Sequence, residues 1–397
     1  MAGVDVATLA ALIEPGGQRL LELVERELDA TNALPLGTRL RRQYDGHLVA
    51  AALTQVSLRR QARVKFGLDA QRMYFTRDAL EQATTRLVAE HRAARLGRAS
   101  PSALVDLGCG LGADLLALLR EGLPATGVDN DPLRVALARS NLSALGLTAH
   151  VLDADALVLD RSHYDIAYAD PSRRGARGRI FDPAGYSPPW TFVLRLLAGD
   201  ACVKVAPGLG HALLPDGVEA EWVSERGEVK EAALWSGRLT STRRRATVLP
   251  AGATLTDGDD PGSAPVREPG RFLYEPDGAV IRAGLVTAVA GLVHGGLLDQ
   301  KIAYVTSDRQ VATPFARGFE VLDRIPYAQK PLRGYLRARG VGPLTVKKRG
   351  VDIDPVALRQ RLALRGDVPA TIVLTRFAGR AGALLVRPLD PSGPTGG

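Results

Sequence analysis

The stretch Val105-Asp106-Leu107-Gly108-Cys109-Gly110-Leu111-Gly112-Ala113-Asp114 decides the fold of this chain. It continues an apolar run and opens a helical pattern, Ala113–Arg120. Its three glycines let the backbone turn sharply and approach a ligand where a Cβ atom would interfere. The stretch therefore predicts a strand, a tight turn and a helix, with a ligand site at the turn.

Two acids near these glycines indicate the kind of ligand. A carboxylate at Asp106 would repel a pyrophosphate but attract a sulfonium that carries an α-amino group. Asp129 lies 21 residues after Gly108, at the expected tip of the next strand, where it can accept hydrogen bonds from ribose hydroxyls. The dinucleotide fingerprint is met only in its G/A variant, because position 113 is Ala. An NAD site is the alternative that these acids disfavour.

The pattern D-x-G-x-G-x-G resembles motif I of the class I S-adenosylmethionine (SAM) dependent methyltransferases. The resemblance implies that SAM is the cofactor, with six binding residues: Asp106, Gly108, Gly110, Gly112, Asp129 and Asp155. Asp129 matches the acid that holds the ribose, and Asp155 matches the acid that reaches the adenine. Asp153 is the alternative register for the second role.

Short apolar runs alternate with helical patterns between residue 98 and about residue 250. The runs are Ala103–Leu107, Ala125–Val128, His150–Leu152, Ile166–Ala169 and Cys202–Val205. Such alternation is typical of βαβ units, so we expect an α/β fold with a Rossmann-like, parallel, doubly wound sheet. Three more strand-like pieces follow without helices, and they suggest antiparallel edge strands: Glu219–Ser224, Ala232–Leu234 and Ala246–Leu249.

The regions on either side have other patterns. Apolar residues three and four apart, as in 79–88, predict helices before the core, and 281–294 predicts one after it. A stretch rich in Asp, Gly and Pro at 256–265 marks a linker. We expect a helical region at 1–97, the core at 98–255, the linker at 256–270, mixed domains at 271–324 and 325–390, and a disordered tail at 391–397.

The fourth expected strand ends in Asp170-Pro171-Ser172-Arg173-Arg174, at the sheet edge where α/β folds place their chemistry. The motif is similar to the (D/N)-P-P-(Y/F) of amino-methylating relatives, in which the acid accepts hydrogen bonds from the target amine. Here the stacking aromatic is missing, and the candidates to replace it are Tyr168, Phe181, Tyr186 and Trp190. We expect Asp170, Pro171 and Arg173 to be catalytic and Arg174 to help position the substrate backbone.

The same run is also similar to the D-P-P-R-x-G of uracil-5 methyltransferases. Those enzymes need a cysteine nucleophile after the fifth strand. Ala206 stands about where that thiol belongs, and Cys202 begins the strand as a small apolar residue, so the sequence disfavours uracil-5 chemistry. The six histidines show no metal-ligand spacing, and we expect no metal site.

Composition places the protein among ordinary globular chains. Its 397 residues are 46% hydrophobic and 24% charged, which excludes wholesale disorder. Two cysteines exclude a disulfide scaffold and fit a reducing cytosol. The N-terminus does not resemble a signal peptide, and no apolar segment reaches the roughly 18 residues of a membrane span. We therefore expect a cytoplasmic protein without a membrane partner.

Across nearly its whole length, the chain resembles a bacterial family with a helical N-terminal part, a SAM-binding core containing D-P-(A/S)-R-R, and a C-terminal THUMP-like domain. The stretches that carry the resemblance include Tyr74–Thr84, Lys204–Gly208, Leu273–Asp277 and Leu344–Gly350. It implies a small ferredoxin-like domain at 271–324, a THUMP-like domain at 325–390 and methylation of RNA, either tRNA or rRNA. Tyr74 lies in a segment that often covers the cofactor, although packing against the sheet explains it as well.

The distribution of charge supports an RNA partner. The net charge is +8, and residues 330–365 alone hold ten basic and two acidic side chains. Such a patch can neutralise several phosphates. We expect its contacts to include Lys330, Arg333, Lys347, Lys348 and Arg349. The rival functions are methylation of a protein or a small molecule, and RNA binding by a non-catalytic protein that keeps SAM.

Overall fold

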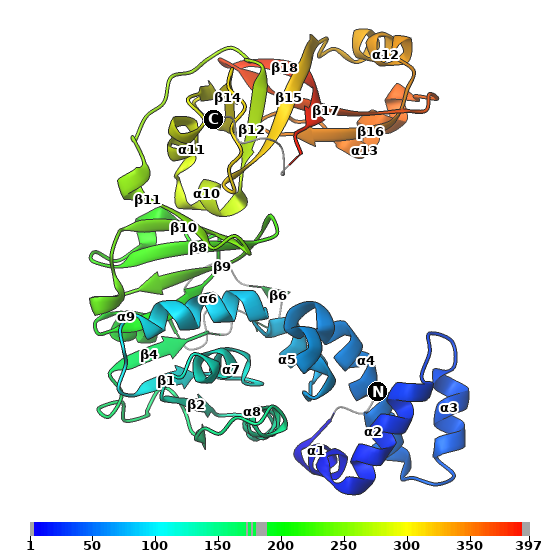
Figure 1. Cartoon of the computed structure of the whole chain (residues 1–397), viewed down its shortest axis with the longest axis vertical. Helices are drawn as coiled ribbons and strands as arrows, with labels where there is room; N and C mark the ends of the chain where they lie inside the picture. Colours follow the sequence, from blue (N-terminus) through cyan, green and yellow to red (C-terminus); the bar gives the residue numbers. More distant parts are fainter. Residues whose placement is uncertain (1–3, 172–173, 176–177, 180–188, 391–397) are drawn as a thin grey trace. The chain divides into compact units, whose positions relative to one another are not determined.

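The computed structural model describes residues 4–171, 174–175, 178–179 and 189–390 (Figure 1). The chain forms two compact units. The first consists of Met1–Val218 and Ala232–Ser241, and the second of Glu219–Glu231 and Thr242–Gly397. Each unit is described by itself below. None of the described helices is both long enough and apolar enough to cross a membrane.

The first unit begins with helices. They are α1 (Val6–Ile13), α2 (Pro15–Glu27), α3 (Ala33–Leu40), α4 (Gly46–Phe66), the 3-10 helix η1 (Gly67–Gln71), α5 (Arg77–Gln82) and α6 (Arg86–Gly97). Short polar side chains fix several starts: the Asp45 carboxylate accepts the first free N–H groups of α4, and Thr76 caps α5. This confirms a helical N-terminal region.

The helix expected across 79–88 is two helices. α5 ends at Gln82 and α6 starts at Arg86, because Ala83 has an extended backbone. The break turns Thr84 inward, where it is buried. The break between the two helices therefore makes the Thr84 side chain available to the site described below.

The core of the first unit is the expected parallel sheet. Its strands are β1 (Leu104–Leu107), β2 (Ala125–Asp129), β3 (Val151–Asp153), β4 (Ile166–Ala169), β7 (Ala201–Val205) and the end of β9 (Glu228–Trp235), in the order β9-β7-β4-β1-β2-β3. All pairs are parallel except β7 with β9. α7 (Ala113–Arg120) and α8 (Pro132–Ala144) pack on β2, and α9 (Trp190–Leu197) packs on β7. The strand order reverses at β1, so the carboxyl ends of β1 and β4 form the crevice that such folds use for ligands.

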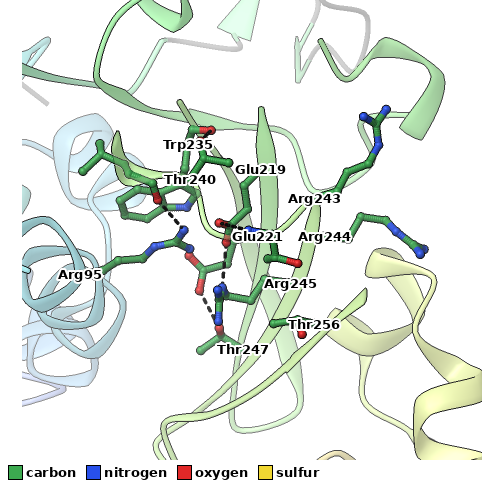
Figure 2. Close-up of polar contacts among 12 residues, drawn as sticks. Arg95, Glu219, Glu221, Trp235, Thr240, Arg243, Arg244, Arg245, Thr247 and Thr256 are labelled. Atoms are coloured by element: carbon green, nitrogen blue, oxygen red, sulfur yellow. Dashed lines mark hydrogen bonds and ion pairs between the residues drawn. The ribbon is translucent and has the colours of Figure 1, made fainter. Parts of the chain in front are cut away.

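In the second unit, β8 (Glu219–Glu225) pairs in parallel with β10 (Arg244–Leu249), which pairs antiparallel with β11 (Ala253–Thr256). The expectation of antiparallel strands is therefore wrong for β8 and β10. The chain reverses twice between them, through β9, so it enters β10 in the direction of β8. Figure 2 shows the polar face of this pair, where Arg245 contacts Glu219 and Thr247 donates to Glu221.

The rest of the second unit is one seven-stranded sheet of order β13-β14-β12-β15-β18-β17-β16. The strands are β12 (Phe272–Pro276), β13 (Gly296–Asp299), β14 (Ile302–Ser307), β15 (Ala316–Ile325), β16 (Val341–Lys348), β17 (Val368–Phe377) and β18 (Arg380–Pro388). β15 pairs with both β12 and β18, so the segments 271–324 and 325–390 share this sheet.

Four helices accompany the seven-stranded sheet. They are α10 (Gly278–Ala283), α11 (Val286–Leu292), α12 (Gln329–Ala338) and α13 (Pro355–Leu362). The single helix expected over 281–294 is wrong, because Gly284 adopts a left-handed backbone (φ 70°) that ends α10 before α11 begins.

Candidate functional site

The glycine turn lies between β1 and α7 and presents backbone to the crevice. Gly108 and Gly112 have φ of 84° and 88°, a region that side chains disfavour. Gly112 lies beside α8, since a Cβ there would be in van der Waals contact with Ala138 at 3.5 Å. The local sequence thus explains the sharp turn between β1 and α7.

Asp106 places a buried carboxyl group beneath this turn. Its side chain is 1% exposed, and its Oδ2 atom has no hydrogen-bond partner among the described residues. Burial raises the pKa of Asp106 well above its usual range, and the nearby carboxylates of Asp114, Asp170 and Asp129 raise it further, against the influence of Arg92. An orphaned carboxylate of this kind fits a cationic amino group as its partner.

Asp129 ends β2 and is tied to the glycine turn. Its Oδ2 accepts the Gly110 N–H at 3.0 Å, and its Oδ1 accepts the Asp131 N–H at 3.1 Å. A carboxylate has about four lone-pair sites, so two remain for the hydroxyls of a ribose. These observations fit the SAM-binding roles expected for Asp106 and Asp129.

The two candidates for the adenine contact lie near the end of β3. Asp153 pairs with Asp129 in the ladder of β2 and β3. Asp155 lies two residues further on, is exposed, and accepts the Leu157 N–H at 2.9 Å. Both are close to the carboxyl edge of the sheet, so the geometry leaves the two registers open.

Asp170 follows β4 and meets a lysine that sequence reasoning did not assign to the site. Lys204 Nζ lies 2.7 Å from Asp170 Oδ2 and 3.2 Å from Thr84 Oγ1. The Lys204 side chain is 6% exposed and that of Asp170 is 24% exposed. One signal was available, because Lys204 is the only charged residue in the apolar strand Ala201–Val205. A cation inside such a strand needs a buried partner.

The network continues from Thr84 into the helices. Thr84 Oγ1 donates to Asp114 Oδ2 at 2.8 Å, and the other oxygen of Asp114 forms an ion pair with Arg92. The Arg92 guanidinium is buried and lies 4.6 Å from the ring centroid of Tyr168. Cations and anions alternate along this chain of contacts, which reduces the cost of burying each of them.

Tyr74 is buried next to the glycine turn, but its side chain has partners of its own. The Asn141 amide of α8 accepts the Tyr74 N–H and donates to the carbonyls of Tyr74 and Leu111. The Tyr74 hydroxyl accepts a hydrogen bond from Gln18, and its ring lies under the Arg59 guanidinium. A substrate contact by Tyr74 therefore stays a prediction.

Several expected site residues lie next to the described residues or outside them. Pro171 is described and buried. Arg173, Phe181 and Tyr186 lie outside the described residues, and Arg174 is described only as backbone of the short strand β5 (Arg174–Gly175). No group of His, Cys, Asp or Glu residues suited to a metal ion occurs in the described parts of the chain.

The basic residues expected to contact RNA divide into two groups. Lys347 and Arg349 approach Glu275 at 2.5 and 3.8 Å, and Arg333 donates to the carbonyl of Arg361. Lys330 and Lys348, in contrast, are exposed and make no hydrogen bond or ion pair with another described residue. The second pair can bind an anion without breaking an internal contact.

Three segments of the chain match known protein families. Residues 104–171 match the description "Methyltransferase domain", residues 316–388 match "THUMP domain-like", and residues 5–62 match a domain of unknown function. A curated relative in two strains of Mycobacterium tuberculosis, named as an uncharacterized S-adenosylmethionine-dependent methyltransferase, is 42% identical over 341 residues. The alignment covers 82% of this chain and 92% of the relative.

A solved structure from Porphyromonas gingivalis W83, described as that of a proposed methyltransferase, has the same fold. Its TM-score is 0.73 at 23% sequence identity, and the match covers 91% of this chain and 100% of the other. At this identity the likeness concerns the fold alone.

Proposed function

Since the chain belongs to the S-adenosylmethionine-dependent methyltransferases, we propose that the acceptor of its methyl group is a base in structured RNA, either tRNA or rRNA. The cofactor is SAM, which supplies an electrophilic methyl carbon on a sulfonium. The THUMP-like match at 316–388 is the observation that carries the proposal for the acceptor.

The residues of the glycine turn would hold the cofactor. Asp106 offers its unpartnered oxygen to a cationic amino group, and the backbone at Gly108 and Gly112 gives close access. Asp129 keeps two lone-pair sites for ribose hydroxyls while its other sites fix the turn. These contacts would position the cofactor at the carboxyl ends of β1 and β2.

Asp170 would orient the acceptor. Its Oδ2 is bound to Lys204, which leaves Oδ1 and the remaining lone pairs to accept an N–H or O–H from the substrate. The ion pair with Lys204 holds the carboxyl group in one orientation, in which it can accept a hydrogen bond. Orientation and removal of a proton are the contributions that methyl transfer asks of the protein.

The charge of the C-terminal segment supports RNA over the rival acceptors. Ten basic residues against two acidic ones occupy 330–365. Lys330 and Lys348 are exposed and make no hydrogen bond or ion pair with another described residue. A phosphodiester backbone attracts such a surface in a salt-dependent way. Methylation of a small-molecule acceptor does not require such a basic surface.

The test is mass spectrometry of nucleosides in RNA from a strain that lacks the gene, beside its parent. We expect one methylated nucleoside to disappear, and to return with the wild-type gene but not with Asp170→Ala. Asp160→Ala, which changes an exposed aspartate in a loop, is the matched control and should restore the nucleoside.

The other outcomes identify the rival functions. An unchanged nucleoside profile in the deletion strain would overturn the proposal and direct attention to protein or small-molecule acceptors. Full restoration by Asp170→Ala would remove Asp170 from the chemistry. If the purified protein binds SAM and RNA but no methyl group is transferred, the protein is a non-catalytic binder.

A further inference from the structure

A second concave site lies on the first unit. It is a groove of about 870 Å³, formed by α2, the middle of α4, η1 and the C-terminal half of α8. We propose that this groove binds a nucleotide that carries one phosphate, either free or as part of the RNA strand. The RNA source rests on the proposed function, whereas the free-nucleotide source does not.

The position of the groove separates it from the methyl-transfer site. α8 starts at Pro132, beside the cofactor acid Asp129, and it lines the groove with Ser140, Ser143 and Ala144 near its other end. At 1.5 Å per residue, Ser140 and Ser143 lie about 12 and 17 Å along α8 from Pro132. Tyr74, which also lines the groove, is connected through Asn141 to Leu111 of the glycine turn, so the groove is a neighbour of that turn and not part of it.

The charge of the lining favours an anion of low charge. Arg26, Arg59, Arg72 and Arg139 come from four different elements, against two carboxylates, Glu22 and Glu25. The Arg72 side chain makes no hydrogen bond or ion pair with another described residue. Glu25 forms an ion pair with Arg60 at 3.6 Å. A net excess of two positive charges suits a single phosphate.

Arg59 is the best-defined element of the groove. It is only 9% exposed, its Nε donates to the carbonyl of Met73 at 2.9 Å, and its guanidinium lies 5.1 Å from the ring centroid of Tyr74. Among the described residues no carboxylate lies within ion-pair distance of it, and burial lowers its pKa. Glu25 is a charged neighbour of Arg59 beyond ion-pair distance. A fixed, nearly buried guanidinium with no direct ion pair among the described residues is arranged to receive a phosphate.

The rest of the lining suits the remainder of a nucleotide. Ile13, Leu21 and Ala144 provide apolar surface for a base, while Ser140 and Ser143 provide hydroxyl groups. The volume lies in the range of sites for ligands of that size, roughly 300–1,000 Å³, and is larger than inorganic phosphate needs. Glu22 could accept hydrogen bonds from a base amine, and it disfavours a polyphosphate.

Protection of a single thiol tests the proposal. Both native cysteines are buried, so Ser143→Cys places one reactive thiol in the groove. Ser102→Cys, exposed and outside the groove, is the matched control. The rate of alkylation by a maleimide is measured on the full-length protein with AMP, GMP, CMP or UMP, with inorganic phosphate, and with total RNA from the deletion strain.

We expect a nucleoside monophosphate or the RNA to slow alkylation of Cys at 143 at least fivefold, with no change at 102. Protection by monophosphates identifies a free nucleotide, and protection by RNA alone identifies a nucleotide of the strand. Arg72→Glu should abolish the protection, and Arg42→Glu, an exposed arginine outside the groove, should not. Protection by neither probe, or equal protection at both positions, overturns the proposal.

Transfer of tritium from labelled SAM to RNA is measured in parallel on the wild-type protein. If RNA is methylated but no probe slows alkylation of the Ser143→Cys variant, the ligand site in the groove is refuted and the proposed RNA acceptor is not. Protection by a monophosphate without RNA methylation refutes the RNA acceptor and leaves the groove in place.

Discussion

The ammonium of Lys204 lies 2.7 Å from the carboxylate of Asp170, although the two residues are 34 positions apart in the chain. The parallel strands β4 and β7 are neighbours, so the residue after β4 and a residue within β7 meet at one edge of the sheet. The pair gives Asp170 a fixed orientation and a positive neighbour. A carboxylate held in this way is suited to accept a hydrogen bond from a methyl acceptor.

Replacing Lys204 should reduce methyl transfer while sparing cofactor binding. Lys204→Met removes the positive neighbour of Asp170 and keeps most of the buried side-chain volume. We expect kcat to fall by about 10²-fold or more, in the range typical of general acid–base groups, because Asp170 loses the partner that orients its carboxylate. Calorimetry with SAM should show an affinity within about threefold of the wild type.

Lys204→Arg is the companion variant, since it keeps the charge but not the shape. Partial activity in Lys204→Arg, beside its loss in Lys204→Met, would support a role through charge. Wild-type activity in Lys204→Met would show that the ion pair only stabilises the fold.

The affinity for SAM should rise with pH through the pKa of Asp106. Burial raises that pKa, so the apo protein favours the protonated acid, whereas the cationic cofactor favours the carboxylate. Calorimetry in steps from pH 5 to pH 9 measures the trend. Asp106→Asn should bind SAM weakly and without that pH dependence, and an unchanged pH trend in this variant would contradict the assignment.

The same shift predicts an opposite effect on stability. A carboxyl group whose folded-state pKa is above its unfolded value of 3.8 stabilises the fold below that value, and this stability is lost as the pH rises through the folded pKa. Asp106→Asn carries no ionisable group at this position, so it does not lose this stability as the pH rises. The Tm of the apo variant should therefore exceed that of the wild type by a margin that grows with pH.

Asp129→Ala should weaken SAM binding more than Asp129→Asn. Alanine removes the acceptors of the Gly110 and Asp131 N–H groups as well as those available to ribose. Hydrogen bonds to a charged group contribute about 1.5–3 kcal/mol each, so a loss of at least tenfold in affinity is expected. Asp155→Ala and Asp153→Ala, measured in the same titration, decide the register, because only the residue that contacts the adenine should lower the affinity.

The C-terminal lysines should separate into RNA contacts and structural residues. Lys348→Glu should weaken RNA binding and reduce its salt dependence, because the side chain is exposed and makes no ion pair among the described residues. Lys347→Met should instead lower the Tm, since it removes the ion-pair partner that lies 2.5 Å from the half-buried Glu275 and leaves Arg349 at 3.8 Å. Fluorescence anisotropy with total RNA and thermal unfolding measure the two effects. Equal loss of RNA affinity in both variants would contradict this division.

Local patterns in the sequence predicted most of the helices and strands. The helix at Ala113–Arg120 has the predicted limits, because the hydrophobic periodicity that marks it acts within a few residues. The prediction failed where one residue changed the backbone or where chain direction mattered. Gly284 divided an expected helix, and two chain reversals made β8 and β10 parallel.

The sequence by itself determined the glycine turn. Asp106 and the glycines belong to one strand–turn–helix segment, and Asp129 lies at the end of the next strand along the chain. Only the tertiary structure decided the polar network that joins Asp170, Lys204, Thr84 and Asp114. Those residues come from two strand ends, a helix break and a helix start, up to 120 positions apart. No periodicity relates them, because the contacts between them follow from the order of strands in the sheet and from a break between two helices.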